Sequence, residues 1–330
     1  MAKSDCEDII KQNLLVTLAD NSFIEQAKQL FSSTYWNAGW QGDYMLLSHQ
    51  IPENELKWFR DKGVLAKKCE PLIDLFTGEY NYPPVVYDKL YLFTPEFKKW
   101  KSIVYLDSDI IVKDNIDRLI DIKTFGAIRD CENKKLKEQF FQSTRVFKDM
   151  QIDFKKPSFN SGVMAINTDI ITNSLFSELQ FLVKNFYKEF RFADQAVLNL
   201  YFYRKWEKLP PIYNLYINEY NYKLPNSNKC VAIHFFTNAG YPKLWDVENP
   251  YFSVWKSNLE KSEFIDLKRI IYTKKWGCFK IIYYSLLLRM VIPLQHLSNS
   301  IDACLGCCGL ILKKCNVNLY NRLRRNKHDE

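Results

Sequence analysis

The sequence predicts an α/β protein in which a single, mostly parallel sheet is flanked by helices. Short apolar runs rich in β-branched and aromatic residues alternate with longer amphipathic segments over the first 265 residues. This alternation is typical of parallel strands joined by helices. Because no internal repeat or low-complexity segment interrupts it, we expect one domain over residues 1–265 and a helical, basic tail over residues 266–330.

The first half of the predicted domain alternates regularly between strands and helices. Apolar runs indicate strands at 13–19, 44–48 and 64–67, and helical spacing or an early proline indicates helices at 23–35, 52–62 and 85–93. The first strand ends in Asp20-Asn21-Ser22, a polar turn before a helix. Such turns at the carboxyl ends of strands are where α/β folds bind ligands.

The second half is built on a central strand at 103–106. Further strands are predicted at 126–129, 159–167 and 230–236, a short helix or turn at 115–122, and helices at 169–190 and 194–205. The segment 131–157 is highly charged and has little periodicity, so we expect a mobile loop or lid there.

Two carboxylates follow the central strand directly, at Asp107 and Asp109, with apolar residues on both sides. Charges beside buried strands cost several kcal/mol unless something cationic meets them. In an extended segment residues i and i+2 point the same way, so the two carboxylates are predicted to converge while Ser108 points away. Paired hard oxygen donors suit Mn²⁺ or Mg²⁺; the alternative is that both merely cap the following turn.

Composition and charge narrow the class of protein. The 330 residues are 47% apolar and 25% charged, which is ordinary for a folded protein, and 15% are aromatic. Residues 268–330 hold twelve Lys and Arg against three acidic residues, a net of +9, so the remainder of the +8 chain carries −1. This asymmetry argues against a nucleic-acid-binding body and for a tail that meets an anionic surface.

The compartment predicted from the sequence is a reducing cytoplasm. There are nine cysteines, an odd number, and the start of the chain has no apolar secretory segment. Lys280 and Arg289 interrupt the most apolar stretch, at 278–297, so we expect no membrane-spanning helix.

The tail leaves two interpretations open. Residues 268–292 form a basic, aromatic amphipathic pattern that suits either an anionic membrane or packing on the sheet, and 313–327 favour the membrane. The membrane interpretation predicts a peripheral protein on the cytoplasmic membrane face and a lipid-linked acceptor. Cys304, Cys307, Cys308 and Cys315 could bind zinc, carry palmitate or be idle buried thiols.

Six segments in order, from about residue 14 to residue 245, resemble glycosyltransferase family 8, the family of glycogenin and bacterial lipopolysaccharide galactosyltransferases. They are VTLADN, the helix of Lys89, VYLDSDIIV, FNSGVMAIN, ADQAVLN and HFFTNAGYPKLW. The resemblance implies a GT-A fold with a Rossmann-like sheet, a UDP-sugar donor, a divalent metal that is usually Mn²⁺, and retention at the anomeric carbon.

The resemblance also implies a metal site and a donor site. The metal ligands would be Asp107, Asp109 and His234, although a histidine in an apolar strand is often a satisfied core residue. Lys243 would neutralise the diphosphate, but it follows His234 by nine residues where the family usually has six. The remaining donor contacts would be Leu18, Asp20, Asn21, Lys89 and Ser108. Asn21 has the alternative of a helix cap, and Lys89 that of a solvated helix residue.

Four residues would lie around the transferred sugar by the same resemblance. Asn160 would approach the reacting carbon, Asp194 and Gln195 would lie under the sugar, and Asp130 would meet its hydroxyl groups. The alternatives are a strand-end turn residue for Asn160 and a helix N-cap for Asp194. Ala193 stands where the family often has Gly.

The function implied is transfer of a hexose, glucose or galactose, from a UDP-sugar to a glycan or lipid-linked saccharide, by front-face attack of the acceptor hydroxyl. A metal-dependent phosphohydrolase is a rival, disfavoured because Ile110 and Ile111 follow the second aspartate where that chemistry wants Thr or Gly. An inactive sugar-nucleotide-binding protein is a third hypothesis, disfavoured because the metal-ligand residues and Asp194 are all present.

Overall fold

The computed structural model describes most of the chain before residue 269. The described ranges are 12–73, 82–130, 134–141, 147, 150–216, 230–235 and 242–268. Nearly all of the predicted tail at 266–330, with its four cysteines, lies outside them, so the domain boundary at 265 stays a prediction. Within these ranges, no helix has the length and apolar character needed to cross a bilayer.

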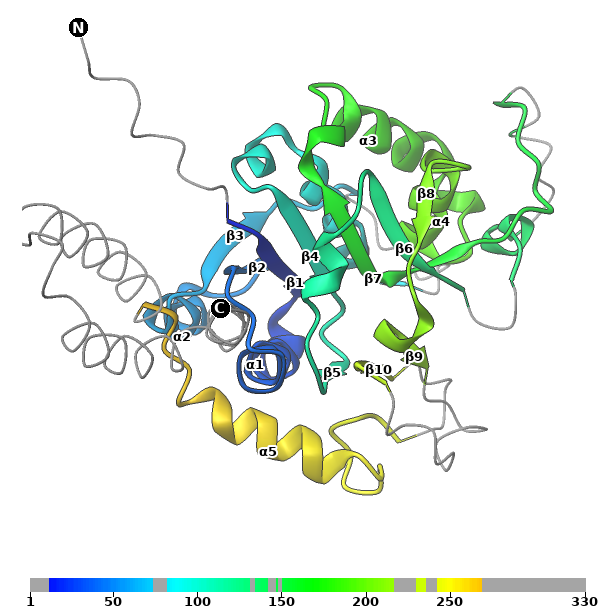
Figure 1. Ribbon diagram of the computed structural model, residues 1–330. Helices are drawn as coiled ribbons and strands as arrows, with labels where there is room; N and C mark the ends of the chain where they lie inside the picture. Colours follow the sequence, from blue (N-terminus) through cyan, green and yellow to red (C-terminus); the bar gives the residue numbers. More distant parts are fainter. Residues whose placement is uncertain are drawn as a thin grey trace, which may run out of the picture. The chain divides into compact units, whose positions relative to one another are not determined.

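A seven-stranded sheet lies at the centre of the described structure, with its strands in the order β3-β2-β1-β4-β7-β6-β8 (Figure 1). Only β7 runs antiparallel to its neighbours, so the sheet is mostly parallel, as predicted. The strands are β1 (Leu14–Ala19), β2 (Asp43–His49), β3 (Leu65–Cys69), β4 (Ser102–Leu106), β6 (Phe125–Arg129), β7 (Phe159–Asn167) and β8 (Trp206–Lys208).

The antiparallel strand β7 explains why so many functional side chains meet at one edge. Residue pairing places Leu106, the last residue of β4, opposite Val163. The amino-terminal half of β7 therefore lies at the carboxyl edge of the parallel strands. Polar residues at the start of β7 are brought beside polar residues that follow β4.

A second sheet of three short strands continues from this edge, in the order β5 (Ile110–Val112), β10 (Ala232–His234) and β9 (Leu215–Tyr216). β10 runs antiparallel to β5 and parallel to β9. The register pairs His234 with Ile110, the residue directly after Asp109. Strand pairing alone thus brings the histidine to the predicted acidic pair.

Helices lie on two sides of the large sheet, with α1, α2 and α5 on one side and α3 and α4 on the other (Figure 1). α1 packs against β1 and α5, whereas α4 packs against β7 and α3 packs against α4. A 3-10 helix, η3 (Pro84–Phe93), packs between the sheet and the pair formed by α3 and α4. The α-helices are α1 (Ile24–Ser33), α2 (Glu53–Lys62), α3 (Leu175–Phe186), α4 (Ala193–Tyr201) and α5 (Phe252–Ser262).

The core of the sheet is apolar on both faces, as a strand covered from both sides requires. Leu14, Leu15 and Val16 of β1 are fully buried. Farther along, the rings of Phe125 and Phe202 stack with their centres 4.1 Å apart, which ties β6 to the end of α4. Burial of this apolar surface holds the carboxyl edge of the sheet in place.

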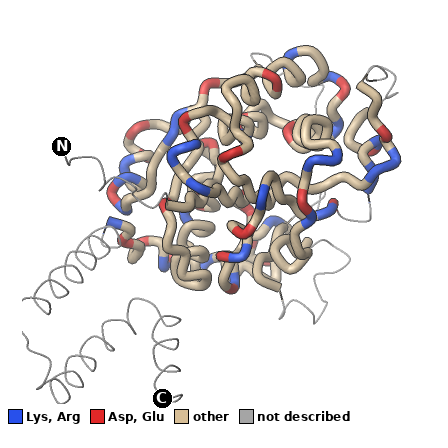
Figure 2. Tube along the Cα trace, turned by 45° about the horizontal axis from the view of Figure 1, so that its top comes forward, with Lys and Arg blue, Asp and Glu red and all other residues tan. Residues whose placement is uncertain are grey.

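Charged residues of both signs are interspersed along the described chain (Figure 2). This distribution agrees with the near-neutral charge of the residues that precede the basic tail.

The long helix predicted at 169–190 is wrong, because that stretch is divided. A 3-10 turn (Thr168–Ile170) precedes α3, and another (Tyr187–Glu189) follows it. Asn167 Oδ1 accepts a hydrogen bond from the N–H of Asp169 at 3.0 Å, and Thr172 Oγ1 accepts one from the N–H of Leu175 at 3.1 Å. These side-chain acceptors start new turns and so compete with a continuous helix.

The segment predicted as a mobile lid at 131–157 is partly packed into the body. Among its described residues, Leu136, Phe140 and Phe147 are buried. The ring of Phe140 lies 6.0 Å from that of Phe190, which follows α3 in the chain. The buried rings of Phe140 and Phe147 therefore hold part of the segment 131–157 against the body, although its many charged residues had indicated an exposed loop.

A buried ion pair links the end of β2 to η3, beside the predicted donor site. His49 Nδ1 lies 2.7 Å from Asp88 Oδ2, and Asp88 is fully buried. Burial raises the pKa of Asp88 to about 6, although His49 acts in the opposite direction. The second oxygen, Oδ1, has no hydrogen-bond partner.

We expect Asp88→Asn to stabilise the protein more at pH 7 than at pH 4. A raised pKa means that Asp88 contributes stability below about pH 4, and that this contribution is lost as pH rises through about 6. Since Asn mimics the protonated acid, the gap in unfolding free energy between variant and parent should grow by up to ~3 kcal/mol. Urea unfolding across this pH range measures the gap. Asp169→Asn, which removes an exposed carboxylate, is the control, and a gap that does not change with pH would contradict the assignment.

Candidate metal and ligand site

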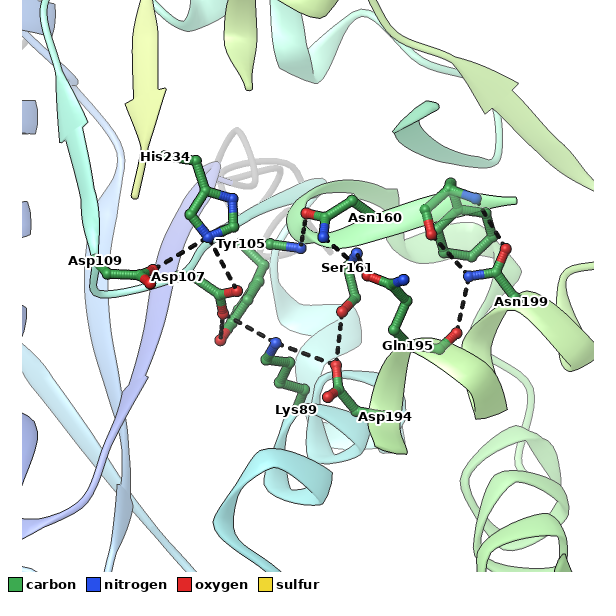
Figure 3. Close-up of polar contacts among 12 residues, drawn as sticks. Lys89, Tyr105, Asp107, Asp109, Asn160, Ser161, Asp194, Gln195, Asn199 and His234 are labelled. Atoms are coloured by element: carbon green, nitrogen blue, oxygen red, sulfur yellow. Dashed lines mark hydrogen bonds and ion pairs between the residues drawn. The ribbon is translucent and has the colours of Figure 1, made fainter. Parts of the chain in front are cut away.

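Asp107, Asp109 and His234 converge on one point at the carboxyl edge of the sheet (Figure 3). One ligand atom from each lies within 4.8 Å of the others. His234 Nε2 is 3.2 Å from Asp109 Oδ1 and 3.9 Å from Asp107 Oδ2. Two carboxylates and an imidazole form a donor set suited to Mn²⁺, so these residues fit a divalent cation.

The two aspartates converge for a different reason from the one predicted. Residues 107–110 form a turn, in which the N–H of Ile110 donates to the carbonyl of Asp107 at 3.2 Å. The predicted direction of the carboxylates is thus confirmed, but a turn and not an extended strand produces it. Ser108 does not point away from the site, because it is nearly buried and lines the same cavity.

The charges of the triad hold one another in the ionised form. Burial by itself would raise the pKa of Asp109, but His234 outweighs it and the pKa is lowered. Burial would likewise lower the pKa of His234, but Asp109 and Asp107 outweigh it and the pKa is raised. Tyr105 donates a hydrogen bond to Asp107 Oδ1 at 2.7 Å and fixes the orientation of that carboxylate.

Lys89 joins this triad to the start of α4. Its Nζ lies 2.9 Å from Asp107 Oδ1 and 3.1 Å from Asp194 Oδ2, and the residue is only 6% exposed. Burial would lower the pKa of Lys89, but the two carboxylates outweigh it and the pKa is raised. The alternative of a solvated helix lysine is therefore wrong.

Asp194 faces the cavity and does not cap its helix. Its Oδ2 accepts a hydrogen bond from Ser161 Oγ at 2.7 Å as well as the contact from Lys89. The N-cap position of α4 is Phe192, and no side chain caps that helix, so the N-cap alternative for Asp194 is wrong. Burial raises the pKa of Asp194, and Lys89 opposes that effect.

Gln195 connects three further residues in a buried network. Its Oε1 accepts a hydrogen bond from Asn160 Nδ2 at 2.8 Å, and its Nε2 donates to Asp130 Oδ2 at 3.0 Å. Gln139 Nε2 also donates to Asp130 Oδ2, at 3.2 Å. The polar atoms that hold these side chains are thus satisfied within the protein, which fixes them in place around the cavity.

These residues surround a cavity of about 790 Å³. The lining includes Leu18, Asp20 and Phe23, from the carboxyl end of β1 and the turn after it. It also includes the aromatic residues Tyr82 and Phe192, together with the triad, Lys89 and Asp194.

All but one of the predicted site residues line this cavity. The exception is Asn21, which is exposed and is not among the lining residues. The alternative that Asn21 caps the helix is wrong, because Asp20 is the cap and accepts a hydrogen bond from the N–H of Ser22 at 2.8 Å. The predicted residues that line the cavity are Leu18, Asp20, Lys89, Asp107, Ser108, Asp109, Asp130, Asn160, Asp194, Gln195, His234 and Lys243.

Sequence reasoning missed several residues that support the site. Ser161 and Gln139 hold Asp194 and Asp130, and Asn214 contacts the ring of His234. Asn214 precedes a two-residue strand, which is too short to produce a periodic pattern. Ser161 and Gly162 stood within a quoted motif, but no feature of the sequence assigned them a contact.

Comparison with known proteins shows which sequences and structures this chain resembles. The model of the family described as Glycosyl transferase family 8 matches residues 15–247. Galactinol synthase 2 of Arabidopsis thaliana is 28% identical over 191 residues, which cover 50% of this chain and 52% of that protein. The glycosyltransferase GlyB of Streptococcus pneumoniae is 28% identical over 196 residues, covering 54% and 44%. This chain therefore spans about half the length of the curated relatives it matches.

Solved structures show the same fold. The galactosyltransferase LgtC, in complex with donor and acceptor sugar analogs, superposes with a TM-score of 0.57 at 16% identity and covers 76% of this chain and 96% of its own. The apo bifunctional glycosyltransferase WbbM gives a TM-score of 0.58 at 18% identity, covering 78% and 51%. The predicted GT-A fold is confirmed by these likenesses, which extend to the fold alone.

We expect Gly162→Ala to distort the triad. A Cβ at this position would lie 2.4 Å from His234 Cε1 and 2.9 Å from Asp107 Oδ2, closer than real contacts allow. Affinity for Mn²⁺, measured by calorimetric titration, should fall by about 10–100-fold, a loss typical of disturbed ligand orientation. The matched control is Gly126→Ala, whose Cβ would meet only the side chains of Leu209 and Ile122. Undiminished affinity in Gly162→Ala would contradict the assigned geometry.

A second substitution tests the strained turn before Asp194. Ala193 has a φ of +41°, in the left-handed region that costs a side-chain-bearing residue roughly 1 kcal/mol. Ala193→Gly should therefore raise the unfolding free energy by ~0.5–1 kcal/mol, measured by urea denaturation. Ala196→Gly, in the interior of α4, should lower it instead. If Ala193→Gly destabilises to the same extent, the turn is not strained.

Proposed function

This chain belongs to glycosyl transferase family 8, and on that premise we propose that it transfers a hexose, glucose or galactose, from a UDP-sugar to a saccharide acceptor. The proposal includes a divalent cation, Mn²⁺ or Mg²⁺, and retention of configuration at the anomeric carbon. The observation that carries it is the meeting of Asp107, Asp109 and His234 beside Lys89 and Asp194 in one cavity.

The donor diphosphate is assigned to the triad and its neighbouring lysines. A divalent cation held by Asp107, Asp109 and His234 would supply a Lewis acid that offsets charge on the departing UDP. Lys89, buried between two carboxylates, is held in its charged form and adds fixed positive potential at the same place. Lys243, at the exposed rim of the cavity, is assigned to the diphosphate from the solvent side.

The nucleoside is assigned to the part of the cavity formed by β1 and the turn after it. Leu18 and Asp20 line this part, and Asp20 is already fixed as a helix cap by its hydrogen bond from Ser22. An apolar side chain beside a carboxylate suits a planar base and a ribose with hydroxyl donors. Carboxyl ends of parallel strands are the general location for such ligands.

The transferred sugar is assigned to Asp194, Gln195, Asn160 and Asp130. Positive charge develops at the anomeric carbon as the donor bond breaks, and a fixed carboxylate nearby stabilises that charge. Asp194 Oδ2 already accepts a hydrogen bond from Ser161 and pairs with Lys89. We therefore assign this carboxylate to electrostatic stabilisation of the sugar carbon and not to a covalent bond with it. The acceptor hydroxyl then attacks from the face that UDP leaves, and a phosphate oxygen of UDP takes its proton.

The acceptor is assigned to the part of the cavity that Tyr82 and Phe192 line. Both rings are partly exposed, and their centres lie 6.5 Å apart at an interplanar angle of 64°. Exposed aromatic rings offer apolar faces against which sugar rings pack, while hydroxyl groups stay in contact with water. A saccharide is therefore the class of acceptor that this part of the cavity favours.

The test is release of UDP from UDP-glucose and UDP-galactose in the presence of Mn²⁺, because slow donor cleavage needs no acceptor. We expect Asp109→Asn to lower that release by ~100-fold or more, since a metal ligand is lost and several kcal/mol of charge stabilisation goes with it. Asp61→Asn, which removes an exposed carboxylate of α2, is the control.

Two outcomes would contradict the proposed function. UDP release by Asp109→Asn at the parent rate would show that the triad does not hold the required cation. Release of inorganic phosphate in place of UDP would favour a phosphohydrolase.

A further inference from the structure

The orientation of one buried asparagine can be deduced from a backbone group. The N–H of Gly162 donates to Asn160 Oδ1 at 2.8 Å, and a backbone N–H can only donate. Asn160 Oδ1 is therefore an acceptor. Asn214 lies 3.0 Å from the same oxygen, so the atom that it presents there is its amide nitrogen, Nδ2. The carbonyl oxygen of Asn214 must then point in the other direction.

That direction is toward the imidazole of His234. Asn214 Oδ1 lies 2.9 Å from His234 Nδ1. Because an amide oxygen only accepts, this hydrogen bond requires a proton on Nδ1, in the charged ring and in the neutral ring alike. A neutral ring that keeps this hydrogen bond has its lone pair on Nε2, the nitrogen that faces Asp109 and Asp107. The hydrogen-bond chain from Gly162 thus determines which ring nitrogen is available to a cation.

We propose that Asn214 is a positioning residue, which selects the Nδ1–H tautomer of His234 and joins the metal triad to the sugar-facing residues. The proposal rests on the proposed function, because it assigns Nε2 of His234 to the cation of that site. Partners that fix the tautomer of a metal-binding histidine usually also fix its ring orientation.

The surroundings of Asn214 leave the amide little freedom. The residue is 1% exposed, and the second hydrogen on Nδ2 is directed at the hydroxyl oxygen of Tyr216, 3.2 Å away. The ring of Tyr216 stacks on that of His234 with centres 5.5 Å apart and an interplanar angle of 28°. Asn214 thus contacts the edge of the imidazole, and Tyr216 contacts its face.

The same amide couples the metal triad to the predicted sugar site. Asn160 Oδ1 accepts a hydrogen bond from Asn214, and Asn160 Nδ2 donates one to Gln195 Oε1 at 2.8 Å. Gln195 in turn donates to Asp130. A change at Asn214 should therefore disturb both the cation ligand and the side chains around the sugar, although Asn214 itself is not a cavity-lining residue.

The first test reads the tautomer of His234 in protein without added metal. Nitrogen NMR distinguishes a protonated from an unprotonated ring nitrogen, at a pH high enough that the imidazole is neutral. The parent should show the proton on Nδ1. Asn214→Leu should lose that preference, whereas Asn214→Asp should keep it, because a carboxylate still accepts from Nδ1–H. Assignment of the signals uses a His234→Gln variant.

The second test titrates Mn²⁺ into the same proteins by calorimetry. Asn214→Leu should bind about 10–100-fold more weakly than the parent. Asn214→Asp keeps the acceptor for Nδ1–H but loses the donor to Asn160, so it should recover part of that loss. Asn258→Ala removes another buried asparagine, on α5, and should bind as the parent does. Circular dichroism and thermal unfolding establish that each variant is folded.

The outcomes separate this inference from the proposed function. If the parent binds no Mn²⁺, the cation site itself is wrong. If the parent binds Mn²⁺ but carries the proton on Nε2, or if Asn214→Leu binds equally well with an unchanged tautomer, the positioning role is wrong and the cation site stands.

Discussion

The structure around the cavity depends on one buried ammonium group. Lys89 Nζ lies within 3.1 Å of carboxylates that come from the turn after β4 and from the start of α4. Without a cation at this point, the buried carboxylate of Asp194 would face the partly buried carboxylate of Asp107, at a cost of several kcal/mol. Lys89 thus joins the turn that carries Asp107 to the start of α4, and it lines the cavity together with both carboxylates.

Strand β7 makes that meeting of residues possible. As the antiparallel member of a mostly parallel sheet, it begins at the edge where its neighbour β4 ends, and the N–H of Asp107 donates to the carbonyl of Gly162 at 2.8 Å. The small side chains at its start allow His234, which arrives from a separate sheet, to approach closely. Glycine at 162 is therefore required by the space that the triad occupies, and not by backbone conformation.

The family match, the structural likenesses and the contacts within this chain each support a different statement about the protein. The family model covers residues 15–247, which contain the whole cavity lining and all but the first residue of the two sheets, and it shows that this chain belongs to glycosyl transferase family 8. The neighbours of known structure share under a fifth of their residues with this chain, so they support the fold. The roles of single residues are proposals, and they rest on contacts within this chain, above all those of Lys89, His234 and Asn214.

The sequence by itself determined the α/β class and the buried strands, and its resemblance to the family pointed to twelve of the residues that line the cavity. Apolar runs and motif spacing are local patterns, so they can be recognised in the sequence without knowledge of the fold. Only the tertiary structure decided that a turn aims Asp107 and Asp109, that Asp194 pairs with Lys89 and does not cap its helix, and that Asn214 holds His234. Each of these depends on a partner distant in the chain, brought into contact by strand register and the reversed direction of β7, which no local pattern records.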